Sequence, residues 1–255
     1  MPFPIPAPSE TQTSPAKPRA PARPGPAALA LALLLTPLLL LAPVPAVAKP
    51  GLAPALQAEV DRAVAAYDRG DRVAAEGAFE SLAARGVPAA EFDLALMHLQ
   101  GQAARPDAAR AQRLLQRAAS AGFVLAQLRL AQGLEGGEFG RRQIAQAQQW
   151  YARAAAAGSV DAQEALGTAY YLGRGLPRDL PQAAHWYRAA ALGGDVGAMY
   201  LLASMYEHGD GLAADLRLAS YWYLQAAQAG DVLAAAKARE MAERLRGGSP
   251  ATARP

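Results

Sequence analysis

The sequence contains no cysteine among its 255 residues. This absence excludes a disulfide framework, a thiolate metal site, a cysteine nucleophile and a lipoprotein anchor. Histidine is scarce as well, because the sequence holds only three: His98, His185 and His208. None of them has the spacing of a zinc motif such as H-E-x-x-H. We expect these histidines at surface or helix-capping positions rather than at catalytic or metal-binding ones.

A strong excess of positive charge is also missing. Residues 1–48 hold three of the 25 Lys/Arg and one of the 22 Asp/Glu, which leaves 22 basic and 21 acidic residues in 49–255. Nucleic-acid binding requires a concentrated basic face. The sequence therefore predicts no nucleic-acid partner.

No catalytic motif is recognisable. The loops 173–175 and 209–211 read Gly-x-Gly, but neither follows a strand and neither is followed by the P-loop lysine. Asp179 and Asp215 stand where helices are expected to start, so helix capping explains them better than paired catalytic carboxylates. We therefore predict no catalytic residue, no metal site and no cofactor.

What the sequence has in abundance is repetition. Gly86, Gly122, Gly158 and Gly194 are each 36 residues apart, and Ala75, Ala111, Ala147 and Ala183 keep the same step. Self-similarity at a fixed period of 20–50 residues is the sequence mark of a solenoid. Neither helix of such a unit can bury its apolar face alone, so each unit depends on its neighbours.

Each unit reads as two helices, best seen in 159–194. From Ala162 the small and apolar residues follow the spacing of one helix face, and Gly173 is expected to end that helix. Asp179 is expected to cap a second helix, with Gln182 in capping-box spacing. Trp186 and Tyr187 lie on the predicted buried stripe of this second helix.

These positions carry a family resemblance. The pattern A-x3-L-G-x2-Y-x2-G-x-G-[LV]-x2-D-x3-A-x2-W-Y-x2-A-A-x2-G resembles the Sel1-like repeat, a relative of the tetratricopeptide repeat. Residues 162–194 match it throughout, and 198–230 match it except at Ala203, where the family has glycine. The resemblance implies an all-α, right-handed α-solenoid of stacked helix-turn-helix repeats. It also implies a protein that acts as an adaptor in larger complexes.

The period divides the chain into units. A short linker, 49–54, precedes the predicted solenoid at 55–246. Its units are 55–86, 87–122, 123–158, 159–194 and 195–230, followed by a capping helix at 232–246 whose polar outer face suits the end of a solenoid. Residues 247–255 are expected to be a disordered tail.

Residues 1–48 predict a Sec-type signal peptide. A proline-rich, basic n-region precedes an almost purely apolar run at 27–42, and Ala46-Val47-Ala48 offers a cleavage site after Ala48. The alternative is an uncleaved anchor, although roughly 17–25 apolar residues are needed to span a bilayer. We therefore expect a periplasmic or secreted protein; the alternative is inner-membrane anchored and faces the periplasm.

A solenoid offers an extended concave surface lined by the first helix of each unit. Residues on these helices that do not repeat are free to specialise, and we take them as candidates for a partner-binding groove. The candidates are Gln127, Leu128, Gln132, Gln163, Glu164, Thr168, Tyr171, Met199, Tyr200, Ser204 and Glu207. An equally weighted alternative is that the apolar ones pack against adjacent helices.

Together these features predict a non-catalytic scaffold of the bacterial envelope that binds a protein or peptide partner on its concave face. The rival hypothesis is an envelope hydrolase acting on cell-wall material. Carboxylates or a Ser/Lys pair converging in the groove would favour the hydrolase, and spacing alone identifies no such set.

Overall fold

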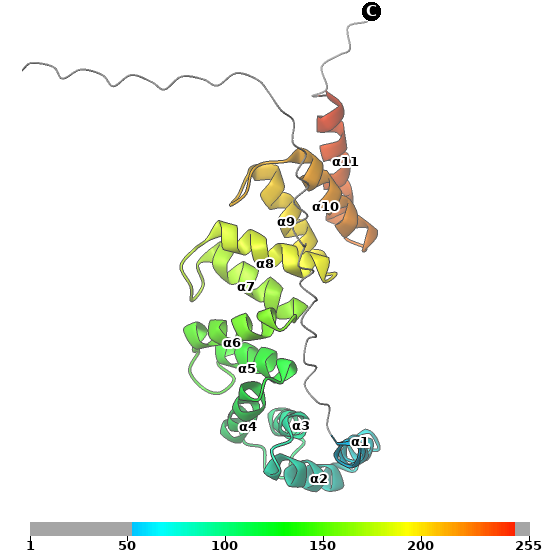
Figure 1. Ribbon diagram of the computed structural model, residues 1–255, viewed down its shortest axis with the longest axis vertical. Helices are drawn as coiled ribbons and strands as arrows, with labels where there is room; N and C mark the ends of the chain where they lie inside the picture. The colour runs from blue at the N-terminus through cyan, green and yellow to red at the C-terminus, as the bar shows by residue number, and fades with distance from the viewer. Residues whose placement is uncertain (1–52, 248–255) are drawn as a thin grey trace, which may run out of the picture. The chain divides into compact units, whose positions relative to one another are not determined.

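The computed structural model describes residues 53–247, which form eleven α-helices and no strands (Figure 1). The helices are α1 (Pro54–Asp68), α2 (Arg72–Ala84), α3 (Pro88–Leu99), α4 (Ala108–Ser120), α5 (Val124–Gly136), α6 (Ile144–Ala156), α7 (Val160–Leu172), α8 (Leu180–Leu192), α9 (Val196–His208), α10 (Leu216–Gln228) and α11 (Val232–Gly247).

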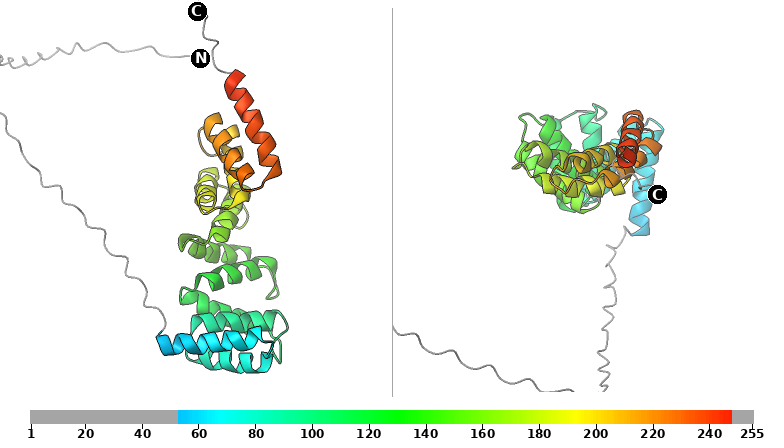
Figure 2. Two further views of the ribbon diagram at one scale, coloured as in Figure 1. Left: turned by 90° about the vertical axis from the view of Figure 1, so that its right-hand side faces the viewer. Right: turned by 90° about the horizontal axis from the view of Figure 1, so that it is seen from above.

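The helix starts repeat at the predicted period. Helices α3, α5, α7, α9 and α11 each begin 36 residues after the one before, and so do α2, α4, α6, α8 and α10. Each helix packs mainly on its immediate neighbours in the chain, as the views in Figures 1 and 2 show. The predicted α-solenoid is therefore confirmed.

Aspartates start several of these helices. The Asp179 carboxylate accepts a hydrogen bond from the Gln182 backbone N–H, and Asp107, Asp195 and Asp215 cap their helices in the same way. The other hydrogen bond of the expected capping box, from the Asp179 backbone N–H to the Gln182 side chain, is not formed. The Asp179 N–H instead donates to the Tyr170 carbonyl at 3.0 Å. The loop is thereby tied to the end of the preceding helix.

The glycines of the Gly-x-Gly loops have two different roles. Gly173 and Gly209 take left-handed conformations that end α7 and α9. A Cβ on Gly211 would lie 2.3 Å from the backbone carbonyl carbon of Leu180, and one on Gly175 would lie 2.6 Å from the Ile144 side chain. The second glycine thus lets each loop contact the start of the second helix in the preceding unit.

The core consists largely of alanines and aromatic rings. Ala183, Ala190 and Ala219 are fully buried, and so are the rings of Tyr187 and Tyr223. Small residues let helices approach closely while the rings fill the remaining space. Trp186 differs from the prediction, because it is only partly buried against the core while Trp222 is buried.

His98 also contradicts the sequence-based expectation. It is 3% exposed at the end of α3, and both ring nitrogens lack a hydrogen-bond partner within residues 53–247. The repeat explains this position, because 36 and 72 residues later it holds Leu134 and Tyr170, on the inward face of α5 and α7. His98 is therefore a core residue, neither a surface residue nor a cap.

Other predictions lie outside the described residues. These are the signal peptide at 1–48, the first part of the linker at 49–54 and the tail from residue 248. Within 53–247, none of the helices combines the length and the apolar character needed to cross a bilayer. Helix α1 begins at Pro54 and α11 ends at Gly247, each within one residue of the predicted boundary.

Candidate functional site

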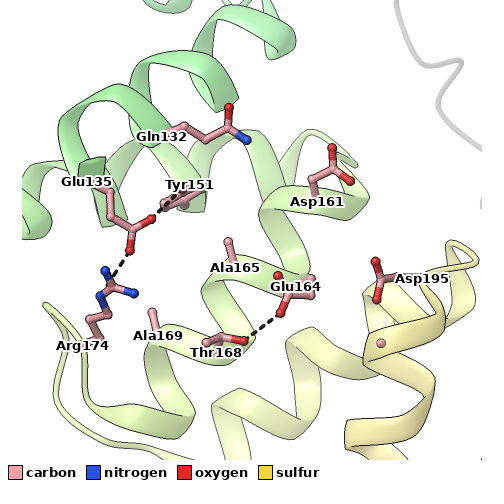
Figure 3. Close-up of a pocket in the computed structure, with 11 residues that line it drawn as sticks. Gln132, Glu135, Tyr151, Asp161, Glu164, Ala165, Thr168, Ala169, Arg174 and Asp195 are labelled. Carbon is pink, nitrogen blue, oxygen red and sulfur yellow. Dashed lines mark hydrogen bonds and ion pairs between the residues drawn. The ribbon is translucent and has the colours of Figure 1, made fainter. Parts of the chain in front are cut away.

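The first helices of three consecutive units, α5, α7 and α9, border a groove with a volume of about 520 Å³ (Figure 3). Most of its lining is polar. The polar and charged lining residues are Gln132, Glu135, Tyr151, Asp161, Glu164, Thr168, Arg174 and Asp195. Polar side chains from three consecutive units thus converge at one place.

Glu135 is held at one end of the groove. The Tyr151 hydroxyl donates to the Glu135 carboxylate at 2.9 Å, and the Arg174 guanidinium lies 3.4 Å from the other carboxylate oxygen. Burial, together with the Glu135 carboxylate, raises the pKa of Tyr151, so its hydroxyl remains a donor. Arg174 comes from the Gly-x-Gly loop of the following unit, so this ion pair joins two repeats.

A second chain of hydrogen bonds holds Glu164 in the middle of the groove. The Thr168 hydroxyl donates to Glu164 at 2.8 Å and lies 2.9 Å from the Tyr187 hydroxyl. Because the single Thr168 proton is used toward Glu164, Tyr187 is the donor in the second bond. Burial is the main cause that raises the pKa of Tyr187. The buried Tyr187 thus positions Thr168 and, through it, the carboxylate of Glu164.

Acidic groups outnumber cations at the groove. Its lining contains four carboxylates, those of Glu135, Asp161, Glu164 and Asp195, and one cation, Arg174. Arg174 pairs with Glu135, and Asp195 caps α9 through the Ala198 backbone N–H. Glu164 and Asp161 have no ion pair within 53–247. The groove therefore suits a positively charged group.

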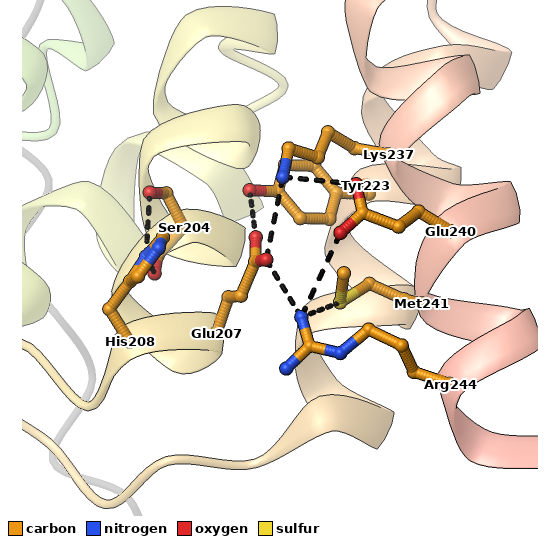
Figure 4. Close-up of polar contacts among 8 residues, drawn as sticks. All are labelled: Ser204, Glu207, His208, Tyr223, Lys237, Glu240, Met241 and Arg244. Carbon is orange, nitrogen blue, oxygen red and sulfur yellow. Dashed lines mark hydrogen bonds and ion pairs between the residues drawn. The ribbon is translucent and has the colours of Figure 1, made fainter. Parts of the chain in front are cut away.

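The equivalent position two units later is already occupied. The Tyr223 hydroxyl donates to Glu207 at 2.9 Å, as Tyr151 does to Glu135, and Lys237 and Arg244 of α11 lie 3.4 and 2.9 Å from the same carboxylate (Figure 4). Burial favours a higher pKa for Glu207, but the Tyr223 hydrogen bond and the Lys237 charge outweigh it and lower this pKa. The capping helix thus fills this position, whereas no helix of 53–247 covers the groove at α5–α9 in this way.

The structure explains two predicted groove residues as packing residues. The Gln127 and Gln163 amides each donate to a backbone carbonyl of the preceding helix, at Ala119 and Ala155 respectively, both at 3.1 Å. Gln127 is 7% exposed, so its prediction as a groove-lining residue is wrong. One unit earlier the position is Glu91, which cannot donate; Arg117 takes the donor role, bonding the Ala83 carbonyl and pairing with Glu91.

The remaining candidates fall into residues that line the groove and residues that pack against neighbouring helices. Gln132, Glu164 and Thr168 line the groove. The apolar and aromatic candidates are partly buried and pack against the core, which favours the packing alternative for Leu128, Tyr171, Met199 and Tyr200. Ser204 lies 3.4 Å from the His208 ring, and the Glu207 side chain is only 5% exposed beneath α11. Partner binding by any of them stays a prediction.

Sequence reasoning missed Asp161, Arg174 and Asp195 as groove residues. Arg174 was expected only as part of a Gly-x-Gly loop, and Asp161 and Asp195 lie at the starts of α7 and α9, so none of the three was taken as a groove candidate. One signal was available: Glu135 and Tyr151 are 16 residues apart, and so are Glu207 and Tyr223. Within residues 53–247, no three His, Asp or Glu side chains converge in a way that could hold a metal ion.

Comparison with known proteins identifies the family to which these repeats belong. A model of the Sel1 repeat family matches residues 88–123, 124–159, 160–195 and 196–231. The matched repeats begin one residue after the predicted unit starts. No curated protein was found to be similar in sequence.

The solved structures that resemble this chain include the following two. One is c5321, a protective antigen present in uropathogenic Escherichia coli strains that displays an SLR fold; it is 29% identical, with a TM-score of 0.68 over 73% of this chain and 41% of that one. The other is a Sel1 repeat protein from Oxalobacter formigenes, 32% identical, with a TM-score of 0.61 over 66% of this chain and 49% of that one. This chain therefore spans less than half the length of either.

Proposed function

Because the chain belongs to the Sel1 repeat family, we propose that it is a non-catalytic adaptor that binds a segment of a partner protein in the groove of α5, α7 and α9. Repeats of this family generally mediate protein–protein interactions. The observation that carries the proposal is the groove itself, where polar side chains of three units converge and no helix of residues 53–247 covers them.

The charge of the groove specifies the partner segment. Glu164 and Asp161 have no ion pair among the described residues, and the only cation at the groove is committed to Glu135. A segment that brings Lys or Arg side chains would complete these carboxylates with charge-assisted hydrogen bonds. Repulsion between like charges would exclude an acidic segment, which gives the groove selectivity as well as affinity.

We also propose that the adaptor is exported and works in the bacterial envelope, in the periplasm or after secretion. The support is the apolar run at 27–42 with its basic flank and the cleavage site after Ala48. The intact mass of the exported protein tests this. A chain that starts at Lys49 supports export with cleavage, whereas a full-length mass favours an inner-membrane anchor.

Affinity capture tests the adaptor function. The full-length protein is compared with a Gln132→Arg, Asp161→Arg variant, which changes two exposed groove residues without touching the core. The matched control is Gln228→Arg, Glu243→Arg, two exposed residues of α10 and α11 outside the groove. We expect a partner that the control retains and the groove variant loses. Equal capture by both variants would contradict the proposed groove.

The convergence of carboxylates gives the hydrolase hypothesis one specific observation in its favour. Glycoside hydrolysis needs a pair of carboxyl groups in unlike environments. Three of the four groove carboxylates already accept a hydrogen bond: Glu135 from Tyr151, Glu164 from Thr168, and Asp195 from the α9 backbone. Release of soluble fragments from purified cell-wall material, abolished by Glu164→Gln, would establish the hydrolase in place of the adaptor.

A further inference from the structure

A second cavity lies in the N-terminal part of the solenoid, away from the groove. It has a volume of about 230 Å³ and is bordered by Val64 and Tyr67 of α1, Phe79 of α2, and Asp93 and Leu96 of α3. Sites for whole small molecules typically measure about 300–1,000 Å³. This cavity is therefore of a size for one side chain rather than for a larger ligand.

Most of the residues that form the cavity walls are apolar, and the Tyr67 ring is held in place. Phe79 is 2% exposed, whereas Val64 is 38% exposed. The Tyr67 ring is held at both ends, because its hydroxyl donates to the Gln102 side chain and the Arg72 guanidinium stacks on its face at 3.8 Å. A side chain that enters would contact aliphatic and aromatic carbon atoms along its length. Because the Tyr67 ring is already held in place, binding would not carry the entropic cost of ordering that ring.

Three polar side chains interrupt this apolar lining, those of Asp93, Asp68 and Gln100. Asp93 has no hydrogen bond and no ion pair with any residue of 53–247. Burial alone raises its pKa from 3.8 to about 6, and no neighbouring charge acts on it. The other charged groups near the cavity are Asp68 on its rim, also without an ion pair among the described residues, and Arg72 behind the Tyr67 ring. Asp93 is thus a partly desolvated anion with no counter-ion in the described part of the chain.

We propose that this cavity binds the side chain of a lysine presented by a partner protein. The four-carbon stem of lysine matches the apolar walls and its ammonium group matches Asp93. A neutral apolar side chain would desolvate Asp93 further without supplying a charge, and an acidic one would be repelled by Asp93 and Asp68. The inference rests on the proposed function only in that the lysine belongs to a partner protein.

A small probe tests the cavity without the partner. Methyl signals of Val64 and Leu96 in the full-length protein are followed by NMR during titration with Nα-acetyl-lysine methylamide. The matched probe is Nα-acetyl-norleucine methylamide, which has the same stem and no charge. We expect saturable shifts at these two residues with the lysine probe and none with the norleucine probe.

Variants make the test specific. Asp93→Asn keeps the shape of the side chain and should weaken the lysine probe about tenfold or more, as loss of one charge-assisted contact does. Asp161→Asn, in the groove, should leave this affinity unchanged. The wild-type affinity should also fall as the pH drops below the Asp93 pKa of about 6, because the protonated carboxyl no longer carries the charge.

Equal shifts with both probes, or an unchanged affinity in Asp93→Asn, would overturn the inference. The outcome is separable from that of the adaptor function. A response to the lysine probe without a groove-dependent partner supports the cavity and removes the groove of α5, α7 and α9 as the binding surface. A groove-dependent partner without a response to the probe does the reverse.

Discussion

Gly211→Ala is the change that most sharply tests how the repeats are joined. In the structure a Cβ at this position would lie 2.3 Å from the carbonyl carbon and 2.5 Å from the carbonyl oxygen of Leu180. Both atoms belong to the backbone at the start of α8, so no side chain can rotate away to make room. The loop and α8 would have to move apart, at the junction between two repeat units.

The expected loss has two parts. A left-handed conformation, here with φ of +72°, costs an alanine ~1–2 kcal/mol. Overpacking against a rigid neighbour typically adds ~1–3 kcal/mol. Gly209→Ala is the matched control, because Gly209 has φ of +78° in the same loop but its added Cβ would only touch Ala214 at 3.4 Å, an ordinary contact.

Urea unfolding of both variants gives the comparison. We expect Gly211→Ala to be less stable than Gly209→Ala by the overpacking part, ~1–3 kcal/mol. The change in unfolded-chain entropy from glycine to alanine is common to both variants and cancels. Equal losses of stability would refute the argument that the second glycine is required by close approach of the preceding unit.

Three further predictions follow from the contacts. Trp222→Ala should cost ~3–5 kcal/mol of stability, and Trp186→Ala clearly less because Trp186 is only partly buried; thermal or urea unfolding that ranks them in reverse would contradict this assignment. Glu207→Ala should lower the free energy of unfolding by ~1–3 kcal/mol, because Tyr223, Lys237 and Arg244 lose their shared acceptor. Hydrogen exchange of the backbone amides in α11 should accelerate. Unchanged exchange would show that this network does not hold the helix. Asp93 has a pKa raised from 3.8 to about 6 in the folded state, so the folded protein binds this proton more tightly and stability should fall as the pH rises through that window. Asp93→Asn should remove this component and stabilise the protein at neutral pH by ~1–3 kcal/mol, as unfolding at a series of pH values will show; a variant with the same pH dependence as the wild type would contradict it.

The fold could be predicted from the sequence because its determinants are local and repeated. The 36-residue step, the aspartate caps and the left-handed glycines each act within a few residues, and each occurs several times. The role of Gly175 and Gly211 could not be predicted in this way. It depends on a backbone approach between residues 31 apart, which the pattern alone does not distinguish from a helix stop.

The groove was only partly predictable for a related reason. Non-repeating residues of the first helices include those that bind and those that correct local packing, and the sequence pattern treats them alike. Gln127 and Gln163 each donate a hydrogen bond to a backbone carbonyl. The ring centroid of Tyr171 lies 6.5 Å from that of Tyr187, and the ring centroid of Tyr200 lies 5.2 Å from that of Tyr223. Only the three-dimensional positions of the neighbouring units distinguish these packing residues from the groove residues Gln132, Glu164 and Thr168.

The Glu135 and Glu207 sites show how one motif serves two purposes. Both carboxylates accept a hydrogen bond from a tyrosine 16 residues later in the chain. At Glu207 the capping helix supplies two cations and closes the site, whereas at Glu135 one arginine of the next loop supplies the charge. At the end of the solenoid, Lys237 and Arg244 of α11 pair with the Glu207 carboxylate. A partner that brings cations to the α5–α9 groove would pair with its carboxylates in the same way.

Site-specific photo-crosslinking in living cells tests the central claim most directly. A photoreactive residue replaces Gln132 in the groove, and in a second strain it replaces Gln228 on α10, which is exposed outside the groove. We expect one protein to be crosslinked from position 132 and not from position 228. Crosslinking of the same protein from both positions, or of none from position 132, would contradict the assignment of this groove as the interaction surface.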